Sequence, residues 1–245
     1  MAEPIEAFVK SMFAEAREEL RRQDSGFIAT VDAAMRLANG PLQFDARKIK
    51  PTKSLPVEWV AVLESCTDVT MQVHALEGSV DALEPEFYED LDADRAGRLI
   101  YHNITSWVHH AWALATKVDV LIAKVCDLPL VPEKTALAVK YKLERTYRNR
   151  IETEVKAVME PTRTPLTHGA GGVGLMARGV TEIGGWEGTV AAGILPSFFL
   201  DGGYIQDVSN ARHWLARRKS HTKGLLARIG TILGDFEQDR EAIKA

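Results

Sequence analysis

Apolar side chains recur every three or four residues near the start of the chain, which predicts an amphipathic helix. Its apolar face is formed by Ile5, Phe8, Val9, Met12, Phe13, Ala16 and Leu20. Its other face carries Glu15, Arg17, Glu18, Arg21 and Arg22. A helix with one apolar and one charged face is typical of the surface of a helical protein, so we expect this segment to pack on a larger core.

A shorter helix is predicted for about residues 27–37, ending before Gly40, because glycine is favoured just past a helix end. Residues 40–55 contain two prolines and three lysines and are interpreted as a solvated connection. Ser54 is then expected to cap a long helix with Pro56 in its first turn. This helix runs through Trp59, Val60, Leu63, Val69 and Val73.

The strongest helical pattern covers about residues 94–127, with an apolar band wide enough for the central helix of a bundle. The band comprises Leu99, Ile100, Ile104, Trp107, Val108, Ala111, Leu114, Ala115, Val118, Leu121, Ile122 and Val125. Pro129 and Pro132 are expected to separate this helix from the next, at about residues 133–159, which Pro161 ends. The apolar positions of that helix are Leu137, Val139, Tyr141, Leu143, Tyr147, Ile151, Val155 and Val158.

Residues 161–204 contain eleven glycines and three prolines and are predicted to be irregular. A last helix is predicted for about residues 206–243. Gly224, Gly230 and Gly234 fall inside it, and they either interrupt the helix or mark a close helix–helix approach. The fold expected is an all-α bundle of about six helices with a Gly-rich irregular segment before the last one. We expect a single domain over residues 1–245, with residues 1–53 as a candidate N-terminal subdomain and residues 161–204 as a Gly-rich excursion.

Composition excludes several classes of protein. The 245 residues are 46% hydrophobic and 26% charged, with a formal net charge of −4, which is ordinary for a soluble globular chain. Two cysteines are too few for a disulfide framework. No apolar run approaches the roughly 20 residues that span a bilayer, and no signal-peptide pattern begins the chain. The expectation is therefore a cytoplasmic protein without a membrane partner.

Charge is unevenly distributed along the sequence. Residues 77–94 hold eight acidic side chains and no basic one, which we interpret as a solvated face or loop. Residues 133–163 hold eight basic against five acidic side chains, and residues 206–228 hold six against one. Two basic helices that line one groove could follow a phosphate backbone, although two ordinary solvated helix faces explain the same pattern.

The most specific local feature is a pair of basic motifs. Tyr147-Arg148-Asn149-Arg150 lies late in the helix at about 133–159, and Arg163 is followed five positions later by His168. An imidazole with an ordinary pKa near 6.5 exchanges protons near neutral pH, and a guanidinium binds phosphate through a fixed fork of donors.

This Arg-x4-His arrangement after a long helix resembles the motif of the HEPN superfamily, helical bundles that commonly dimerise. Thr164 follows Arg163, where the family often has Asn, Asp or His. The resemblance implies that Arg163 and His168 are catalytic in metal-independent RNA cleavage, with no cofactor. Arg148, Asn149 and Arg150 would be nucleic-acid contacts. It also implies RNA as the partner, a homodimer, and a setting in a toxin or antiviral-defence system.

Alternative interpretations stay open. Arg163 and His168 could simply hydrogen-bond a tight turn, which would leave a non-catalytic helical module that dimerises or binds a regulatory protein. His102, His109 and His110 lie on the predicted central helix without the three- or four-residue pairing typical of helical metal sites, so we expect interface or core roles and no metal. The run from Gly169 to Gly174 lacks the Gly-Lys-Ser/Thr ending of a phosphate-binding loop.

Overall fold

The computed structural model describes residues 3–26, 55–82, 84, 87, 93–128, 133–157 and 208–244. Within these residues all regular structure is helical, so the predicted all-α class is confirmed. The α-helices are α1 (Glu3–Gln23), α3 (Val57–Asp81), α4 (Ala93–Asp127), α5 (Glu133–Arg150) and α9 (Val208–Lys244), and a π-helix, η3 (Ile151–Lys156), continues α5. The predicted helix at 27–37 and the Gly-rich segment at 161–204 lie outside the described residues.

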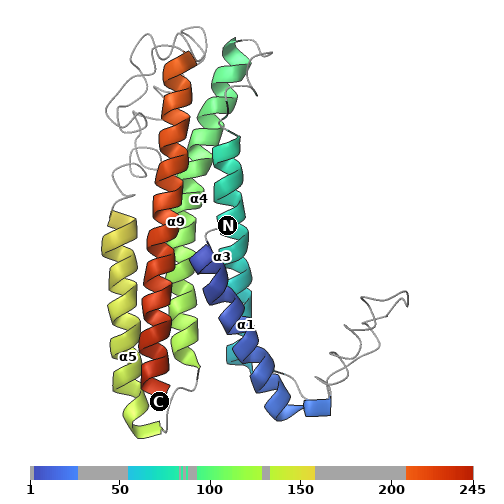
Figure 1. The fold of residues 1–245 in the computed structure, drawn as a ribbon, viewed down its shortest axis with the longest axis vertical. Helices are drawn as coiled ribbons and strands as arrows, with labels where there is room; N and C mark the ends of the chain where they lie inside the picture. The colour runs from blue at the N-terminus through green and yellow to red at the C-terminus, as the bar shows by residue number, and fades with distance from the viewer. Residues whose placement is uncertain are drawn as a thin grey trace, which may run out of the picture.

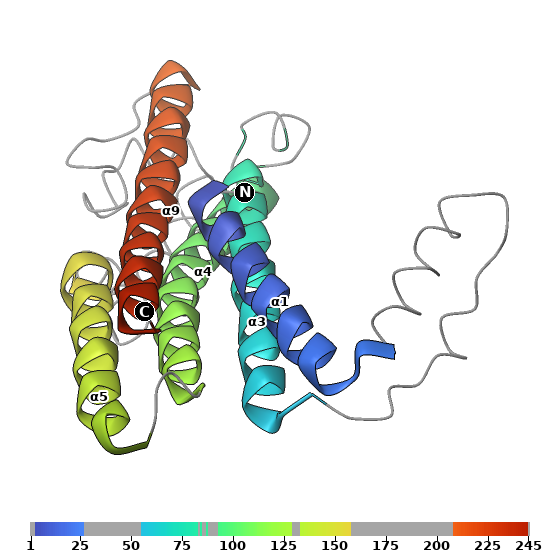
Figure 2. The same ribbon diagram turned by 60° about the horizontal axis from the view of Figure 1, so that its bottom comes forward.

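The helices form an antiparallel bundle. Consecutive helices α3, α4, α5 and α9 alternate in direction, and α5 lies beside only the lower part of α4 and α9 (Figure 1). Helix α1 contacts α3 and α9 and crosses them obliquely (Figure 2). Helix α4 contacts α3, α5, η3 and α9, which agrees with the central place that its wide apolar band predicts.

The core follows the predicted apolar faces closely. Val108, Leu114, Val118, Leu121 and Val125 of α4 are fully buried. Helix α1 buries Ile5, Phe8, Met12 and Ala16, as its spacing predicts, whereas Phe13 of the predicted apolar face is 46% exposed. The free thiols of Cys66 and Cys126 are buried in the same core, and burial raises the pKa of each to about 12.

Two other local predictions are wrong. The N-cap of α3 is Pro56, with no side-chain cap hydrogen bond, so Pro56 precedes the first turn and does not lie in it; Ser54, the predicted cap, lies outside the described residues. On α5, Leu137 and Tyr141 are 75% and 65% exposed, although their apolar character placed them with the buried positions. The buried line runs instead through Leu143, Tyr147, Ile151 and Val155. Tyr141 precedes Leu143 by two residues, which is about 200° around the helix and faces away from the core.

Candidate functional site

The structure describes some of the predicted site residues and not others. Arg163 and His168 lie outside the described residues, so their roles stay predictions. Arg148, Asn149 and Arg150 are the last residues of α5, directly before η3. The candidate site that the structure does describe is therefore the last turn of α5, which carries these three residues, together with the seam between α5 and α4.

Arg148 is held by two carboxylates. Its Nε donates to Asp119 Oδ1 at 2.8 Å and its Nη1 donates to Glu144 Oε1 at 3.0 Å. These hydrogen bonds raise the pKa of the guanidinium, the bond to Asp119 contributing most. Asp119 belongs to α4 and also accepts from Lys156 Nζ at 3.4 Å, so it joins α5 and η3 to the central helix. Arg148 consequently has a structural role that its sequence motif does not indicate.

Arg150 is likewise engaged, but on the α9 side. Its Nε donates to Glu154 and its Nη1 to Asp235 of α9, each at 2.8 Å. The guanidinium carbon also lies 5.5 Å from the ring centroid of Tyr147, within range of a cation–π interaction. Tyr147 donates its hydroxyl to Asp239 at 2.7 Å, and burial and this hydrogen bond raise the pKa of the phenol. Arg150 and Tyr147 together form a polar seam between α5 and α9.

The π-helical turn directly follows these residues. Such turns are rare and are frequent at functional sites. Ile151 and Val155 of η3 are fully buried, and Arg228 of α9 donates to the backbone carbonyl of Glu154 at 2.9 Å. The widened turn is therefore fixed by packing and by a hydrogen bond from the neighbouring helix, and the predicted Arg163–His168 motif follows it in the sequence.

A pocket of about 260 Å³ lies on the α4–α5 face. It is lined by Asp119, Tyr141, Glu144, Arg145, Arg148, Asn149 and Glu152. The residues from α5 and η3 form two rows with a spacing of four positions. The inner row is Glu144, Arg148 and Glu152, and the outer row is Tyr141, Arg145 and Asn149.

The two rows differ in whether their side chains form hydrogen bonds and ion pairs. Arg148 in the inner row is paired with Glu144 and Asp119, and Glu152 lies 3.2 Å from Lys156. The outer-row side chains are exposed, and within the described part of the chain none of them forms a hydrogen bond or ion pair. The unengaged guanidinium of the pocket is thus that of Arg145, which the sequence motif did not single out.

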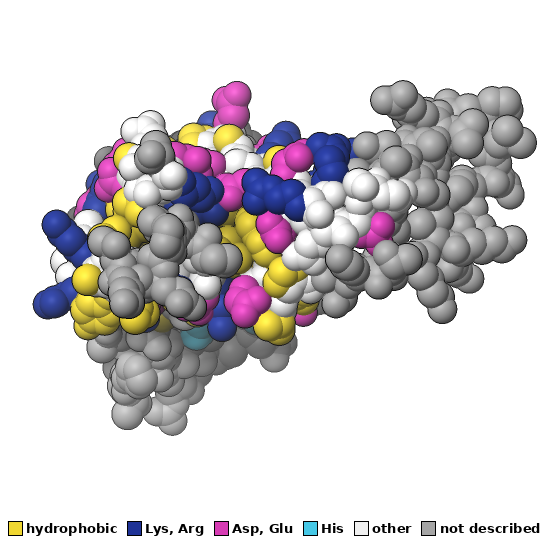
Figure 3. Space-filling view, turned by 90° about the horizontal axis from the view of Figure 1, so that it is seen from below, with side chains coloured by type: hydrophobic (Ala, Val, Ile, Leu, Met, Phe, Trp, Pro, Cys, Tyr) yellow, Lys and Arg dark blue, Asp and Glu magenta, His cyan; other side chains and the backbone are white. Residues whose placement is uncertain are grey.

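The electrostatic character of this region is mixed. The pocket lining holds three carboxylates and two guanidiniums. Viewed from below, basic, acidic and hydrophobic side chains also lie close together over the described surface (Figure 3). On α9, Lys219 is paired with Glu84 from the acidic stretch, and Arg228 donates a hydrogen bond to the backbone carbonyl of Glu154. Some of the predicted basic face and some of the acidic stretch therefore neutralise each other.

The histidines of α4 have different environments. His102 and His109 are exposed, whereas His110 is half-buried and accepts a hydrogen bond at Nδ1 from Gln72 Nε2 of α3 at 2.7 Å. The same amide nitrogen lies 3.1 Å from the backbone oxygen of His110. Burial first, and His109 second, lower the pKa of His110. The residues that the structure describes contain no group of three or more side chains suited to hold a metal ion.

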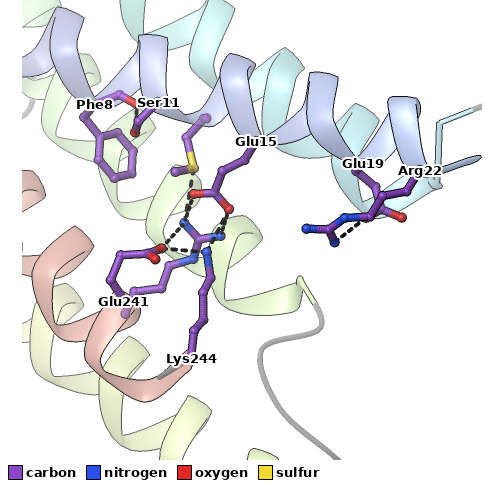
Figure 4. Close-up of polar contacts among 9 residues, drawn as sticks. Phe8, Ser11, Glu15, Glu19, Arg22, Glu241 and Lys244 are labelled. Atoms are coloured by element: carbon purple, nitrogen blue, oxygen red, sulfur yellow. Dashed lines mark hydrogen bonds and ion pairs between the residues drawn. The ribbon is translucent and has the colours of Figure 1, made fainter. Parts of the chain in front are cut away.

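Sequence reasoning also missed a buried ion pair between α1 and α9. Arg240 is 1% exposed, and its Nη1 and Nη2 donate to the two carboxylate oxygens of Glu15 at 2.7 and 2.6 Å. Figure 4 shows the Glu15 carboxylate directed toward Lys244, whose Nζ donates to it at 2.8 Å. No local pattern could reveal the pair, because its members are 225 positions apart.

Among the described helices, none has both the length and the apolar character that a membrane crossing requires. Comparison of the chain with protein families, with curated proteins and with solved structures finds no match.

Proposed function

We propose that this chain is a HEPN-like RNA-binding bundle that cleaves RNA without a metal ion, acting as a homodimer in a toxin or antiviral-defence system. One observation carries the proposal. The exposed outer row of α5 places an aromatic ring, a guanidinium and an amide beside a pocket, on the helix that leads in sequence to Arg163 and His168. Aromatic and basic side chains on one surface are the usual means of binding single-stranded RNA.

The chemistry proposed is transesterification at the ribose. The 2′-oxygen attacks phosphorus while its proton leaves, and the bond to the 5′-oxygen breaks as that oxygen receives a proton. The products are a 2′,3′-cyclic phosphate and a free 5′-hydroxyl. His168 exchanges protons in these reaction steps, and Arg163 stabilises the charge that develops on the phosphate.

The test is cleavage of total RNA by the purified full-length chain in the presence of EDTA. Wild type is expected to cleave, and His168→Ala is expected to lose about 10²- to 10⁴-fold in rate, the usual contribution of a general acid or base. His102→Ala is the matched control, because it removes an exposed imidazole on α4. Equal cleavage by wild type and His168→Ala, or cleavage by neither, would falsify the catalytic role.

A second candidate function is a non-catalytic helical interaction module. It is favoured by the ion pairs of Arg148 and Arg150, which commit both guanidiniums to fixing α5 against α4 and α9. On this alternative, sedimentation detects a dimer whose population rises with concentration, and the wild-type chain binds no RNA. Binding of RNA by wild type would exclude it.

A further inference from the structure

We propose that the pocket between α4 and α5 receives one unpaired RNA nucleotide, with its base on the ring of Tyr141 and its phosphate on the guanidinium of Arg145. The inference rests on the proposed RNA-binding function, and it assigns the contacts of that function to the outer row of α5. Among the residues singled out by the sequence motif, it keeps Asn149 as a contact and gives Arg148 and Arg150 structural roles.

The first argument is the geometry of the outer row. Tyr141, Arg145 and Asn149 are spaced by four residues, so successive side chains are displaced by about 6 Å along the helix axis. All three are exposed and line the same pocket. A nucleotide that lies along this row meets an aromatic face, a cation and an amide in turn.

The second argument is the chemistry of each outer-row side chain. The ring of Tyr141 is 65% exposed, and a stacked base would cover apolar surface that now faces water. Arg145 has the planar donor fork that suits a phosphate, and no described carboxylate engages it. Asn149, one step beyond Arg145, offers a donor to the phosphate and an acceptor to a ribose hydroxyl.

The third argument is the inner row, which forms the wall of the pocket. Asp119 and Glu144 hold Arg148 in place, so the wall is fixed before a ligand arrives. The carboxylate of Glu152 is 66% exposed and, among the described residues, is held by the surface pair with Lys156. It lies eleven residues beyond Tyr141, about 16 Å along the helix axis, so it closes the far end of the pocket and does not contact a base stacked on that ring.

The experiment measures fluorescence anisotropy of labelled RNA with the full-length chain and with catalysis blocked by His168→Ala throughout. The ligands are a short single-stranded oligocytidine, an oligouridine of equal length and a fully paired hairpin. Tyr141→Leu and Arg145→Ala test the two main contacts, and Tyr141→Phe keeps the stacking ring. Lys142→Ala is the matched control, because it also removes one exposed positive charge from α5 but does not line the pocket.

The expected result is a 5- to 100-fold weaker affinity for oligocytidine in Tyr141→Leu, about the range for loss of one stacked base. Tyr141→Phe should bind as the parent does, and Arg145→Ala should lose more affinity than Lys142→Ala. Oligocytidine and oligouridine should both bind more tightly than the hairpin, because a paired base cannot stack on the ring.

The outcomes separate this inference from the function on which it rests. If the parent chain binds no RNA, both the proposed function and the inference are overturned. If it binds RNA but Tyr141→Leu binds equally well, or Lys142→Ala and Arg145→Ala weaken binding equally, RNA binding stands and the pocket assignment is overturned. Equal affinity for oligocytidine and the hairpin overturns the assignment of an unpaired nucleotide to the pocket.

Discussion

Arg240 of α9 carries a buried charge that links this helix to α1. Its guanidinium is 1% exposed and binds both carboxylate oxygens of Glu15, while its Nε is buried without a hydrogen-bond partner in the described structure. Removing a guanidinium from water costs free energy that only close pairing offsets. The stability of the α1–α9 contact therefore depends on Glu15 more than on any exposed ion pair of α1.

We predict that Glu15→Gln lowers the free energy of unfolding by about 3 kcal/mol, because it removes the bidentate partner of a buried charge and leaves it only the exposed Glu241 carboxylate, 3.9 Å from its Nη1. Urea denaturation measures this change. Glu18→Gln removes an exposed carboxylate that pairs with Arg21 on the same helix, so it should cost less than about 1 kcal/mol. The double variant Glu15→Leu with Arg240→Met should recover most of the loss, because no buried charge remains. Similar losses in Glu15→Gln and Glu18→Gln would contradict this account.

The same carboxylate predicts a pH dependence. Burial alone would raise the pKa of Glu15, but hydrogen bonds from Arg240 and Lys244 outweigh it, and the pKa falls below its ordinary value of 4.5. The unfolded chain therefore binds the proton more readily than the folded chain. The stabilisation is fully present above the ordinary pKa and is lost as the pH falls through the lowered one.

The expected observation is a difference in unfolding free energy between wild type and Glu15→Gln that is constant near neutral pH and shrinks below about pH 4.5. Urea titrations at a series of pH values measure it. Parallel stability curves for the two proteins down to strongly acidic pH would show that the carboxylate is not stabilised in this way.

Single residues also show what the sequence alone could not predict. The motif predicted Arg148 and Arg150 as nucleic-acid contacts, because a guanidinium suits phosphate. Their partners Asp119 and Asp235 lie 29 and 85 positions away, so only the folded chain shows that these donors are engaged. Arg145 has no such partner among the described residues, and nothing in the sequence distinguished it from its neighbours.

The elements themselves were predictable because prolines and apolar spacing mark them. Predicted helices at 94–127 and 206–243 correspond to α4 at Ala93–Asp127 and α9 at Val208–Lys244. The π turn was not predictable, because it depends on the packing of Ile151 and Val155 and on a hydrogen bond from α9. Helix α9 is also continuous through its three glycines, so the prediction of a close helix approach must be judged at each of them.

Gly230 is the one of these three glycines at which the structure requires the absence of a side chain. A Cβ there would lie 2.6 Å from Cβ of Pro4 in α1, whereas at Gly224 and Gly234 it would meet nothing within 4 Å. We predict that Gly230→Ala destabilises the protein by about 1–3 kcal/mol, the usual cost of overpacking. Gly224→Ala and Gly234→Ala should stabilise it by about 0.5–1 kcal/mol through helix propensity. Thermal unfolding of the three variants checks this, and equal effects at all three positions would rule out the close contact.

At the scale of the whole molecule, stability should decrease from the central helix toward α1. Among the described elements, α4 packs against four others and contributes fully buried residues between Val108 and Cys126, whereas α1 packs mainly against α3 and α9. We predict that amides between Val108 and Val125 exchange with solvent later than those of α1, because α1 has fewer packed neighbours to lose. Hydrogen exchange followed by mass spectrometry tests this order, and slower exchange in α1 would contradict it.

The burial of both cysteines has a practical consequence for such measurements. Cys66 and Cys126 are fully enclosed, and their raised pKa keeps them in the unreactive thiol form near neutral pH. A cysteine introduced on an exposed face is therefore the group that a maleimide dye or spin label would modify in the folded protein. One label on α1 and another on α5 would report whether the distance between these helices changes when RNA is added, without first replacing the native thiols.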